Sequence, residues 1–266
     1  MAGLLRQDMD GPVATLTLNR PDKRNALNEE LVAALRRALT DLANDDHVRA
    51  IVLTGAGSVF SAGADLAALQ DLQTASPLAN QDDSAHLAGL FEAVYRHPKP
   101  IIAKVNGHAI AGGCGLAAVC DLSIAARPAK LGFTEVRIGF VPAIVSVFIV
   151  RKVGEAAARD LLLRGRLIDA PAAVGMGLIT RTVSPAELDP TVAALADELA
   201  TETSGSAVRL TKQLLADLPG MGLHEALDHA VMMNAFARST NDCQAGISAF
   251  LDNTDPPWKS ARSSET

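Results

Sequence analysis

Short apolar runs and helically spaced apolar residues alternate along the first two thirds of the chain. Val13–Leu18 is a β-prone run that ends at a turn sequence, Asn19-Arg20-Pro21-Asp22. Asn28 suits a helix cap, and leucines recur after it at a spacing that places them on one helical face. These leucines are Leu31, Leu35, Leu39 and Leu42. The pattern predicts a strand followed by an amphipathic helix.

The same alternation continues to about residue 183. Strands are predicted over 49–54, 101–105 and 122–125, and helices over 85–96, over 116–119 and from Pro142 onward. This order is typical of an α/β fold with short parallel connections. Residues 71–84 are polar, interrupted by proline and poorly periodic, which predicts a mobile surface loop over or beside a site.

After Ser184 the pattern becomes helical throughout. Helices are predicted over 187–203, 205–217, 222–238 and 240–251, followed by a frayed end over 260–266. An all-helical tail after an α/β body often packs on a neighbouring chain.

Composition excludes several function classes. The 266 residues carry a net charge of -6 with few aromatic residues, which disfavours nucleic-acid binding. Three cysteines without a CxxC pair indicate neither a disulfide framework nor a zinc site, so we expect no metal and a reducing cytoplasm. The first eight residues lack a signal-peptide core, and the apolar run 140–150 is shorter than the roughly 20 residues that cross a bilayer. We therefore expect no membrane partner.

Two stretches of small residues carry the first candidate chemistry: Ser61-Ala62-Gly63-Ala64-Asp65 and Ala111-Gly112-Gly113-Cys114-Gly115. Each leads from a strand-like run into a helix-like run, so each can point free backbone N–H groups outward. Two such turns facing each other can polarise a carbonyl oxygen. Tight packing of helix against strand is the alternative explanation for Gly112-Gly113. Dinucleotide, P-loop and G-x-S-x-G motifs are absent from the sequence.

Glu135 is the candidate acid or base. Its neighbourhood is largely apolar, and burial there would raise its pKa and suit it to proton transfer near neutral pH. An ordinary exposed or arginine-paired glutamate is the alternative. Cys114 with His108 is a weaker nucleophile and base pair, because a small buried cysteine is the better expectation. Asp65 is expected to cap a helix and Asp121 to be structural.

Four motifs taken together resemble the enoyl-CoA hydratase/isomerase (crotonase) family over nearly the whole chain. They read NRPDKRNALN at 19–28, FSAGADL at 60–66, VNGHAIAGGCGLA at 105–117 and CDL at 120–122. The resemblance implies a crotonase-like spiral of ββα units over 1–200 and a C-terminal helical trimerisation region over 201–266. It also implies a homotrimer or a dimer of trimers, a CoA thioester as substrate and no cofactor.

The resemblance assigns roles to individual residues. The thioester oxygen would be held by the backbone N–H groups of Ala64 and Gly112, which stabilise an enolate. The adenine-binding segment maps to Ala26, with Lys23 or Arg24 near the phosphates. In the tail, Phe250 and Lys259 would contact CoA of their own or an adjacent subunit, although acidic residues at 252 and 255 replace a usually basic run. Further candidates for contact with the substrate are Ala62, Asp65, Leu66 and Gly113.

One departure from the family pattern affects the predicted reaction. Typical hydratases place a first glutamate at the position of Gly115 and a second at that of Glu135, and family isomerases resemble the one-glutamate pattern seen here. A glutamate at 115 should raise water addition if space permits. Yet residues 135–146 resemble a bacterial hydratase subgroup that includes methylglutaconyl-CoA hydratases, and within them Pro142-Ala143-Ile144-Val145-Ser146 replaces the glycine-rich run common in other members.

We predict an enoyl-CoA hydratase-type enzyme with Glu135 as acid or base. An enoyl-CoA delta-isomerase and a noncatalytic acyl-CoA-binding protein are the alternatives.

Overall fold

Two sheets form the body of the computed structural model, which describes residues 3–71 and 74–262. The larger sheet has the strand order β1-β2-β3-β5-β7-β10, in which β1 pairs antiparallel with β2 and the other neighbours are parallel. Its strands are β1 (Leu5–Asp10), β2 (Val13–Leu18), β3 (Ala50–Gly55), β5 (Ile101–Val105), β7 (Leu122–Ala126) and β10 (Arg181–Val183). The hairpin and parallel ladder confirm the predicted α/β class.

A second, four-stranded sheet has the order β4-β6-β8-β9, with β9 antiparallel to β8. Its strands are β4 (Val59–Ser61), β6 (His108–Ile110), β8 (Lys130–Gly132) and β9 (Leu167–Asp169). Each of β3, β5 and β7 in the large sheet is followed by a strand of the small sheet and then by a helical segment. This repeat is the ββα spiral that the resemblance implied.

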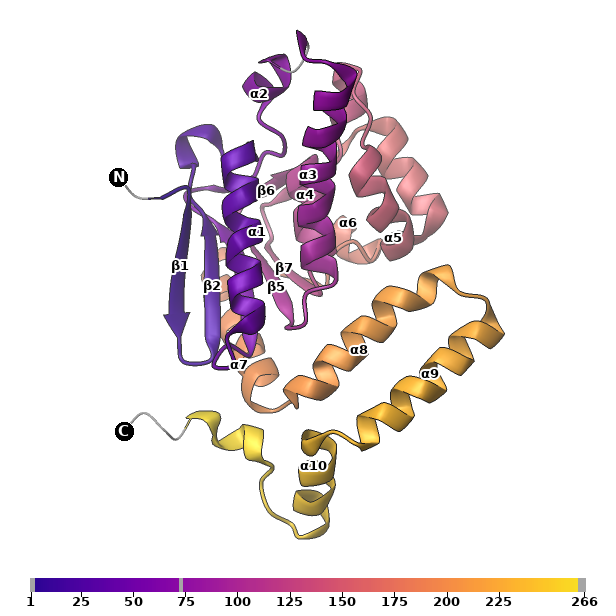
Figure 1. Cartoon of the computed structure of the whole chain (residues 1–266). Coiled ribbons are helices and arrows are strands. Elements are labelled where there is room, and N and C mark those ends of the chain that lie inside the picture. Colours follow the sequence, from indigo (N-terminus) through magenta and orange to yellow (C-terminus); the bar gives the residue numbers. More distant parts are fainter. Residues whose placement is uncertain (1–2, 72–73, 263–266) are drawn as a thin grey trace.

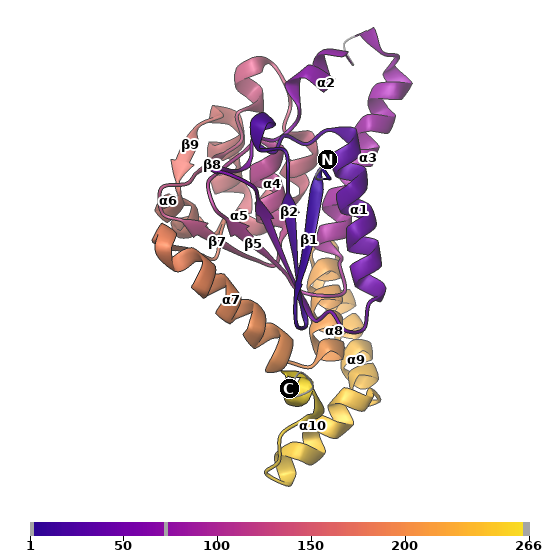
Figure 2. The ribbon, with the colours of Figure 1, turned by 90° about the vertical axis from the view of Figure 1, so that its left-hand side faces the viewer.

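Helices cover both faces of the large sheet (Figures 1 and 2). One cluster of buried side chains joins the sheet to α1 (Glu29–Asn44), α3 (Pro77–Tyr95), α4 (Gly112–Val119) and α5 (Ala143–Arg164). On the opposite face, Val52 and Ile102 pack against Leu188 and Val192 of α7 (Pro185–Thr201). Since neighbouring side chains of a strand point to opposite faces, Ile51 and Val52 of β3 belong to different clusters.

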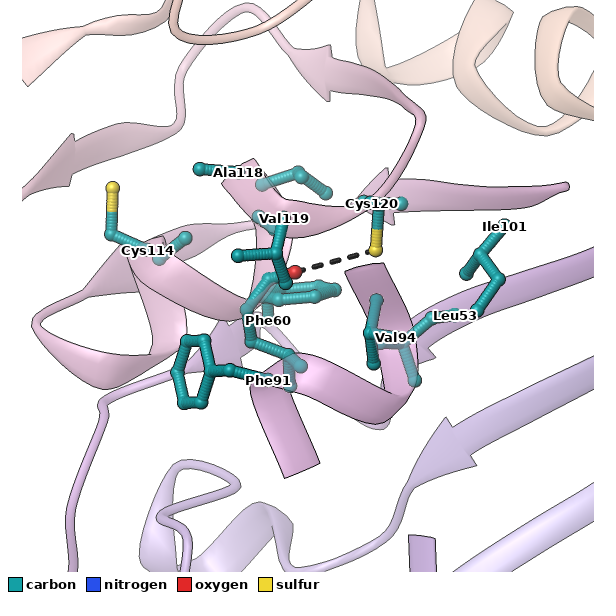
Figure 3. Packing of buried hydrophobic residues seen from close by; sticks show 14 of the residues in the cluster. Leu53, Phe60, Phe91, Val94, Ile101, Cys114, Ala118, Val119 and Cys120 are labelled. Carbon is teal, nitrogen blue, oxygen red and sulfur yellow. Dashed lines mark hydrogen bonds between the residues drawn. The ribbon is translucent and has the colours of Figure 1, made fainter. Parts of the chain in front are cut away.

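The buried cluster is dense around α4. All residues of this helix after Gly112 are buried. Figure 3 shows Phe60, Phe91 and Val119 among the side chains that fill this part of the core. The Cys120 thiol donates to the Leu116 carbonyl, 3.3 Å away. Close packing of this kind holds the beginning of α4 in a fixed position.

The tail consists of α8 (Gly205–Asp217), α9 (Leu223–Arg238) and α10 (Asn241–Leu251), close to the predicted ranges. It extends away from the sheets in both views (Figures 1 and 2). Ion pairs tie α8 to the body, from Lys212 to Asp121 and from Asp217 to Arg96. No residue of α9 is buried. Its large exposed apolar side chains are Leu223, Leu227, Val231, Met232 and Phe236.

Short segments complete the chain: α2 (Leu66–Asp71), α6 (Ala170–Gly175) and the 3₁₀ turns η1 (Pro21–Lys23), η3 (Glu135–Ile138), η4 (Leu218–Gly220) and η5 (Pro257–Arg262). The predicted division at 200/201 falls at the end of α7 and stays a prediction. Within the described ranges, no helix is both long and apolar enough to cross a membrane.

Three local expectations were wrong or incomplete. The pattern missed β1, whose residues are almost all exposed and so carry no apolar alternation. The predicted loop at 71–84 is helical from Pro77 onward, because Ser76 accepts the Ala79 N–H as a helix cap and proline suits the first turn. Its exposed beginning has no apolar periodicity. The predicted frayed end enters η5 as far as Arg262; residues 72–73 and 263–266 lie outside the described ranges.

Replacing Leu35 with alanine tests the predicted apolar face of α1. Leu35 is fully buried, so Leu35→Ala should lower the free energy of unfolding by about 2–5 kcal/mol through lost burial and the cavity left behind. Exposed Arg37 on the same helix is the matched control, and Arg37→Ala should change stability by no more than about 0.5 kcal/mol. Urea unfolding followed by circular dichroism measures both. Equal effects would contradict the assigned face.

Candidate active site

Residues 24–27 pair along the first small-residue turn. The Ala62 N–H donates to the Arg24 carbonyl at 3.0 Å, and the Leu27 N–H donates to the Gly63 carbonyl at 2.7 Å. The Asp65 N–H then donates to the Leu27 carbonyl at 3.0 Å. Leu27 and Ala64 thus form a parallel bridge in which the Ala64 N–H points away from the paired segment. It donates to no other described residue.

Hydrogen bonds of the buried Asn25 stabilise this pairing. Its side chain is fully buried, accepts the Arg20 N–H at 2.9 Å and donates to the carbonyls of Ala56 and Val59. Its own carbonyl accepts the Ser61 hydroxyl at 2.9 Å. These bonds hold Asn25 at a φ of 53°, a left-handed conformation that asparagine tolerates better than most residues.

Arg20 adds a second clamp. Its guanidinium donates to the Ala26 carbonyl at 2.6 Å and to the Asp65 carboxylate at 2.9 Å. The hydrogen bond from Arg20 lowers the pKa of Asp65, which stays ionised. The other oxygen of Asp65 accepts the Ala67 N–H at 3.1 Å. Asp65 is therefore the predicted cap of α2, and it also joins the two segments.

The second small-residue turn meets the first at the beginning of α4. A Cβ on Gly112 would lie 3.9 Å from the Ala64 nitrogen, so the two backbone amides are neighbours. A Cβ on Gly63 would lie only 2.8 Å from both the Ala111 Cβ and the Ile110 carbonyl oxygen. Gly63 also has a φ of 86°. Glycine is required at 63 for both reasons.

The backbone conformation of Ala111 sets the direction of the Gly112 N–H. Ala111 has φ 53° and ψ −127°, a combination that costs an L-residue on the order of 1–3 kcal/mol. Its N–H donates to the Gly132 carbonyl at 2.8 Å, and its carbonyl accepts the Gly115 N–H at 3.0 Å. The Gly112 N–H donates to no other described residue and stands at the positive end of the α4 dipole. Two free donors therefore meet, one from each turn.

Gly113 has a different role from Gly112. A Cβ on Gly113 would overlap the backbone of Ser61, whereas a Cβ on Gly112 would meet nothing closer than 3.8 Å. The tight-packing explanation of the glycine pair therefore applies to Gly113. Gly112 leaves open space beside its N–H.

Glu135 lies at the first position of η3 and is half-buried. Burial raises the pKa of its carboxyl above the usual value for glutamate. Its Oε2 atom is buried and has no hydrogen-bond partner among the described residues. Glu135 is thus neither of the ordinary alternatives, an exposed or an arginine-paired glutamate. Burial is the main cause of the raised pKa of the Cys114 thiol, and the Glu135 carboxylate adds to it, so the two side chains lie within electrostatic range of each other.

Gly115, on that turn, faces a closed wall. A Cβ at this position would overlap Val145 Cγ1 and lie 2.9 Å from Phe91 Cε1. The space that a glutamate at 115 would need is therefore already filled. Gly115→Glu alone is therefore not expected to raise water addition, because that expectation required free space at position 115.

Comparisons with known proteins agree with this geometry. A model of the enoyl-CoA hydratase/isomerase family matches residues 8–261. The chain belongs to this family. A Thermus thermophilus relative that bears an enoyl-CoA hydratase name is 48% identical over 246 residues, covering 92% of this chain and 97% of the relative. The crotonyl-CoA hydratase of Syntrophomonas wolfei is 35% identical over 246 residues, covering 90% and 92%.

Solved structures of the family share the fold. A Mycobacterium smegmatis enoyl-CoA hydratase superimposes with a TM-score of 0.89 at 35% identity, covering 97% of this chain and 99% of that one. Pseudomonas aeruginosa AtuE superimposes with a TM-score of 0.91 at 31% identity, covering 97% and 100%. These similarities confirm the crotonase fold and an enzyme of this family.

The remaining candidates for CoA contact occupy two distant places. Lys23 and Arg24 are exposed on and just after η1, beside buried Ala26, and Leu66 is exposed at the start of α2. Ala62 is half-buried in the first turn. Phe250 is 83% exposed on α10, which lies at the opposite end of the molecule from α2 in both views (Figures 1 and 2).

Lys259 lies in η5, which follows α10, the helix that carries Phe250. Its ammonium pairs with Glu202 and Asp255, both at 3.4 Å, and the hydrogen bond to Glu202 contributes most to a raised pKa. The structure therefore does not bring Phe250 and Lys259 to the small-residue turns of their own chain.

Cys114 and His108 do not form a catalytic pair. Burial raises the pKa of the Cys114 thiol to about 12, so the thiol stays protonated at neutral pH. His108 is exposed, and its Nδ1 accepts the Lys130 N–H at 3.0 Å. Asp121 is structural as predicted, since it accepts the Ile101 N–H and pairs with Lys212. The described part of the chain contains no cluster of three metal-ligating side chains.

Sequence reasoning missed three residues that shape the site: Arg20, Asn25 and Val145. Arg20 and Asn25 lie within the first family motif, and their spacing around a proline turn was the available signal. Val145 belongs to a segment that the sequence singled out, but nothing predicted its contact with Gly115, because the two residues are 30 positions apart.

Glu135→Gln should change stability in a pH-dependent way. Burial raises the pKa of Glu135 in the folded protein, so its neutral form stabilises the fold fully below the unfolded pKa of about 4.3. That contribution is lost as pH rises through the folded pKa. Glutamine does not titrate, so the melting temperature of the variant relative to wild type should increase from pH 4 to pH 8. Thermal scans across this range measure it; a difference that falls with pH would contradict the raised pKa.

Proposed function

We propose that this protein is an enoyl-CoA hydratase-type enzyme that moves a proton at the α-carbon of an acyl-CoA thioester. The observation that carries the proposal is the meeting of two free backbone N–H groups, on Ala64 and Gly112, together with a half-buried Glu135 whose Oε2 has no partner among the described residues and which lies within electrostatic range of Cys114.

The two N–H groups would donate to the thioester carbonyl oxygen. Removing a proton from the α-carbon, or adding a nucleophile at the β-carbon, moves an electron pair onto that oxygen. Donors already fixed by packing stabilise the resulting enolate without reorganising, and loss of one such donor typically costs about 10²–10³ in rate. The positive end of the α4 dipole adds to this stabilisation.

Glu135 would exchange the proton. A glutamate whose pKa is raised by burial holds a proton closer to neutral pH than an exposed one, which favours both its donation and its removal. Its unpartnered Oε2 is free to receive a proton from carbon.

An enoyl-CoA delta-isomerase is the second candidate function, and the closed wall at Gly115 favours it. Glu135 alone can take a proton from one carbon and return it to another, whereas hydration by the two-carboxylate mechanism uses a glutamate that the position of Gly115 does not supply.

The candidate residues for binding CoA lie at two ends of the chain, which favours an oligomer in which two subunits share one CoA. We propose that the adenine lies beside Ala26 and that Lys23 or Arg24 approaches the phosphates. Because Phe250 and Lys259 lie at the other end of the chain, they would contact the CoA of a neighbouring subunit in a homotrimer or a dimer of trimers. The exposed apolar side chains of α9 suit such packing.

Glu135→Gln tests the catalytic proposal. Turnover of 2-enoyl-CoA or 3-enoyl-CoA substrates should fall at least about 10²-fold, because glutamine keeps the shape of the side chain but cannot exchange the proton. Glu155→Gln, which removes an exposed ion-paired glutamate on α5, is the matched control and should retain wild-type turnover. Products are identified by mass and by double-bond position across several chain lengths.

The outcomes separate the alternatives. Unchanged turnover in Glu135→Gln would exclude its role as acid or base. A wild-type protein that binds CoA thioesters but converts neither substrate would support the noncatalytic acyl-CoA-binding alternative instead.

A further inference from the structure

Val145, within the Pro142–Ser146 segment, touches the candidate active-site turn. It lies in the first turn of α5 and is 4% exposed, with its Cγ1 directed at Gly115 of α4. This contact involves neither of the two backbone donors, Ala64 and Gly112, and it does not involve Glu135. Any role of Val145 in the reaction rests on the proposed function.

The wall behind Gly115 is apolar and rigid. Phe91 is fully buried and approaches the same position, and its ring stacks on that of Phe148 with centroids 6.0 Å apart. Tyr95 packs edge-on against Phe148 at 5.3 Å. Three elements, α3, α4 and α5, therefore close together around a glycine that has no side chain of its own. The side chains next to Gly115, those of Val145 and Phe91, offer no polar atom to hold a water molecule.

The two reactions open to the site differ in their need for water. In double-bond migration, Glu135 takes a proton from C4 of a 2-enoyl thioester, the electrons shift to form the C3=C4 bond and an enolate, and the same proton returns to C2. In hydration, the oxygen of water bonds to C3, the C2=C3 electrons move to the thioester oxygen, C2 gains a proton and water loses one. Only hydration needs a water molecule held next to C3.

We propose that Val145, seated against Gly115, shifts the products from hydration toward double-bond migration, the second candidate function, by excluding water from the side of the acyl chain that faces the first turn of α4. Val145 is thus a specificity-determining residue, and residues 115 and 145 act as a pair. The pairing also explains why a glutamate cannot enter position 115 alone: the valine must shrink first.

The test is the ratio of 3-hydroxyacyl-CoA to 3-enoyl-CoA formed from one 2-enoyl-CoA substrate. Val145→Ala opens space beside Gly115, and Val145→Thr keeps the side-chain volume while adding a hydroxyl that can hold water. Each should raise the ratio at least about fivefold. The double variant Gly115→Glu with Val145→Ala should raise it further. Val147→Ala, at an exposed position two residues along α5, is the control and should leave the ratio unchanged.

The ratio answers a different question from total turnover. A purely structural role of Val145 would lower both products together and leave their ratio unchanged. Ratios within twofold of wild type in folded Val145→Ala and Val145→Thr would overturn the inference, even where Glu135→Gln abolishes turnover and so supports the proposed function. Absence of both products from wild-type protein would overturn the proposed function and the inference with it.

Discussion

Backbone pairing between residues 24–27 and 62–65 is the constraint on which the candidate site depends. Hydrogen bonds through Leu27 consume the Gly63 carbonyl and the Asp65 N–H, and they leave the Ala64 N–H directed the other way. If the pairing register shifted by one residue, the Ala64 N–H would point at the paired segment and be consumed by it, because successive amides of an extended chain point to opposite sides. Buried Asn25 resists such a slip, since its side chain has partners only in this register.

Three residues of the candidate site have locally unfavourable features. Ala111 holds a backbone conformation that an L-residue disfavours, Glu135 keeps a buried oxygen without a partner among the described residues, and Gly115 gives up its side chain to close packing. Strain and unsatisfied polar atoms cluster at functional sites because surrounding structure holds them there. Here the surroundings are the dense core around α4 and the bonds that Gly132 and Gly115 make to Ala111.

The tail divides the candidate binding residues between two ends of the chain. Lys23, Arg24 and Ala26 lie near the small-residue turns, whereas Phe250 and Lys259 lie beyond α9. In the proposed oligomer, a neighbouring subunit would cover the exposed apolar residues of α9 and receive the tail residues that lie far from the turns. Under this proposal, assembly and substrate binding depend on the same segment.

The sequence by itself determined many of the elements, but it missed β10 and all four strands of the small sheet, each of which is only three residues long and too short to show a period. Burial on one face imposes a readable period, so α1, β3, β5, β7 and the tail helices appeared close to their observed limits. Exposed segments such as β1 and the beginning of α3 escaped prediction because no apolar period marks them. The motifs also indicated Ala64, Gly112 and Glu135 as the chemical centre. Only the tertiary structure decided that the two N–H groups meet, that Glu135 has a buried unpaired oxygen, and that Val145 fills the space beside Gly115. Those facts depend on contacts between segments tens of residues apart, and local periodicity carries no information about such contacts.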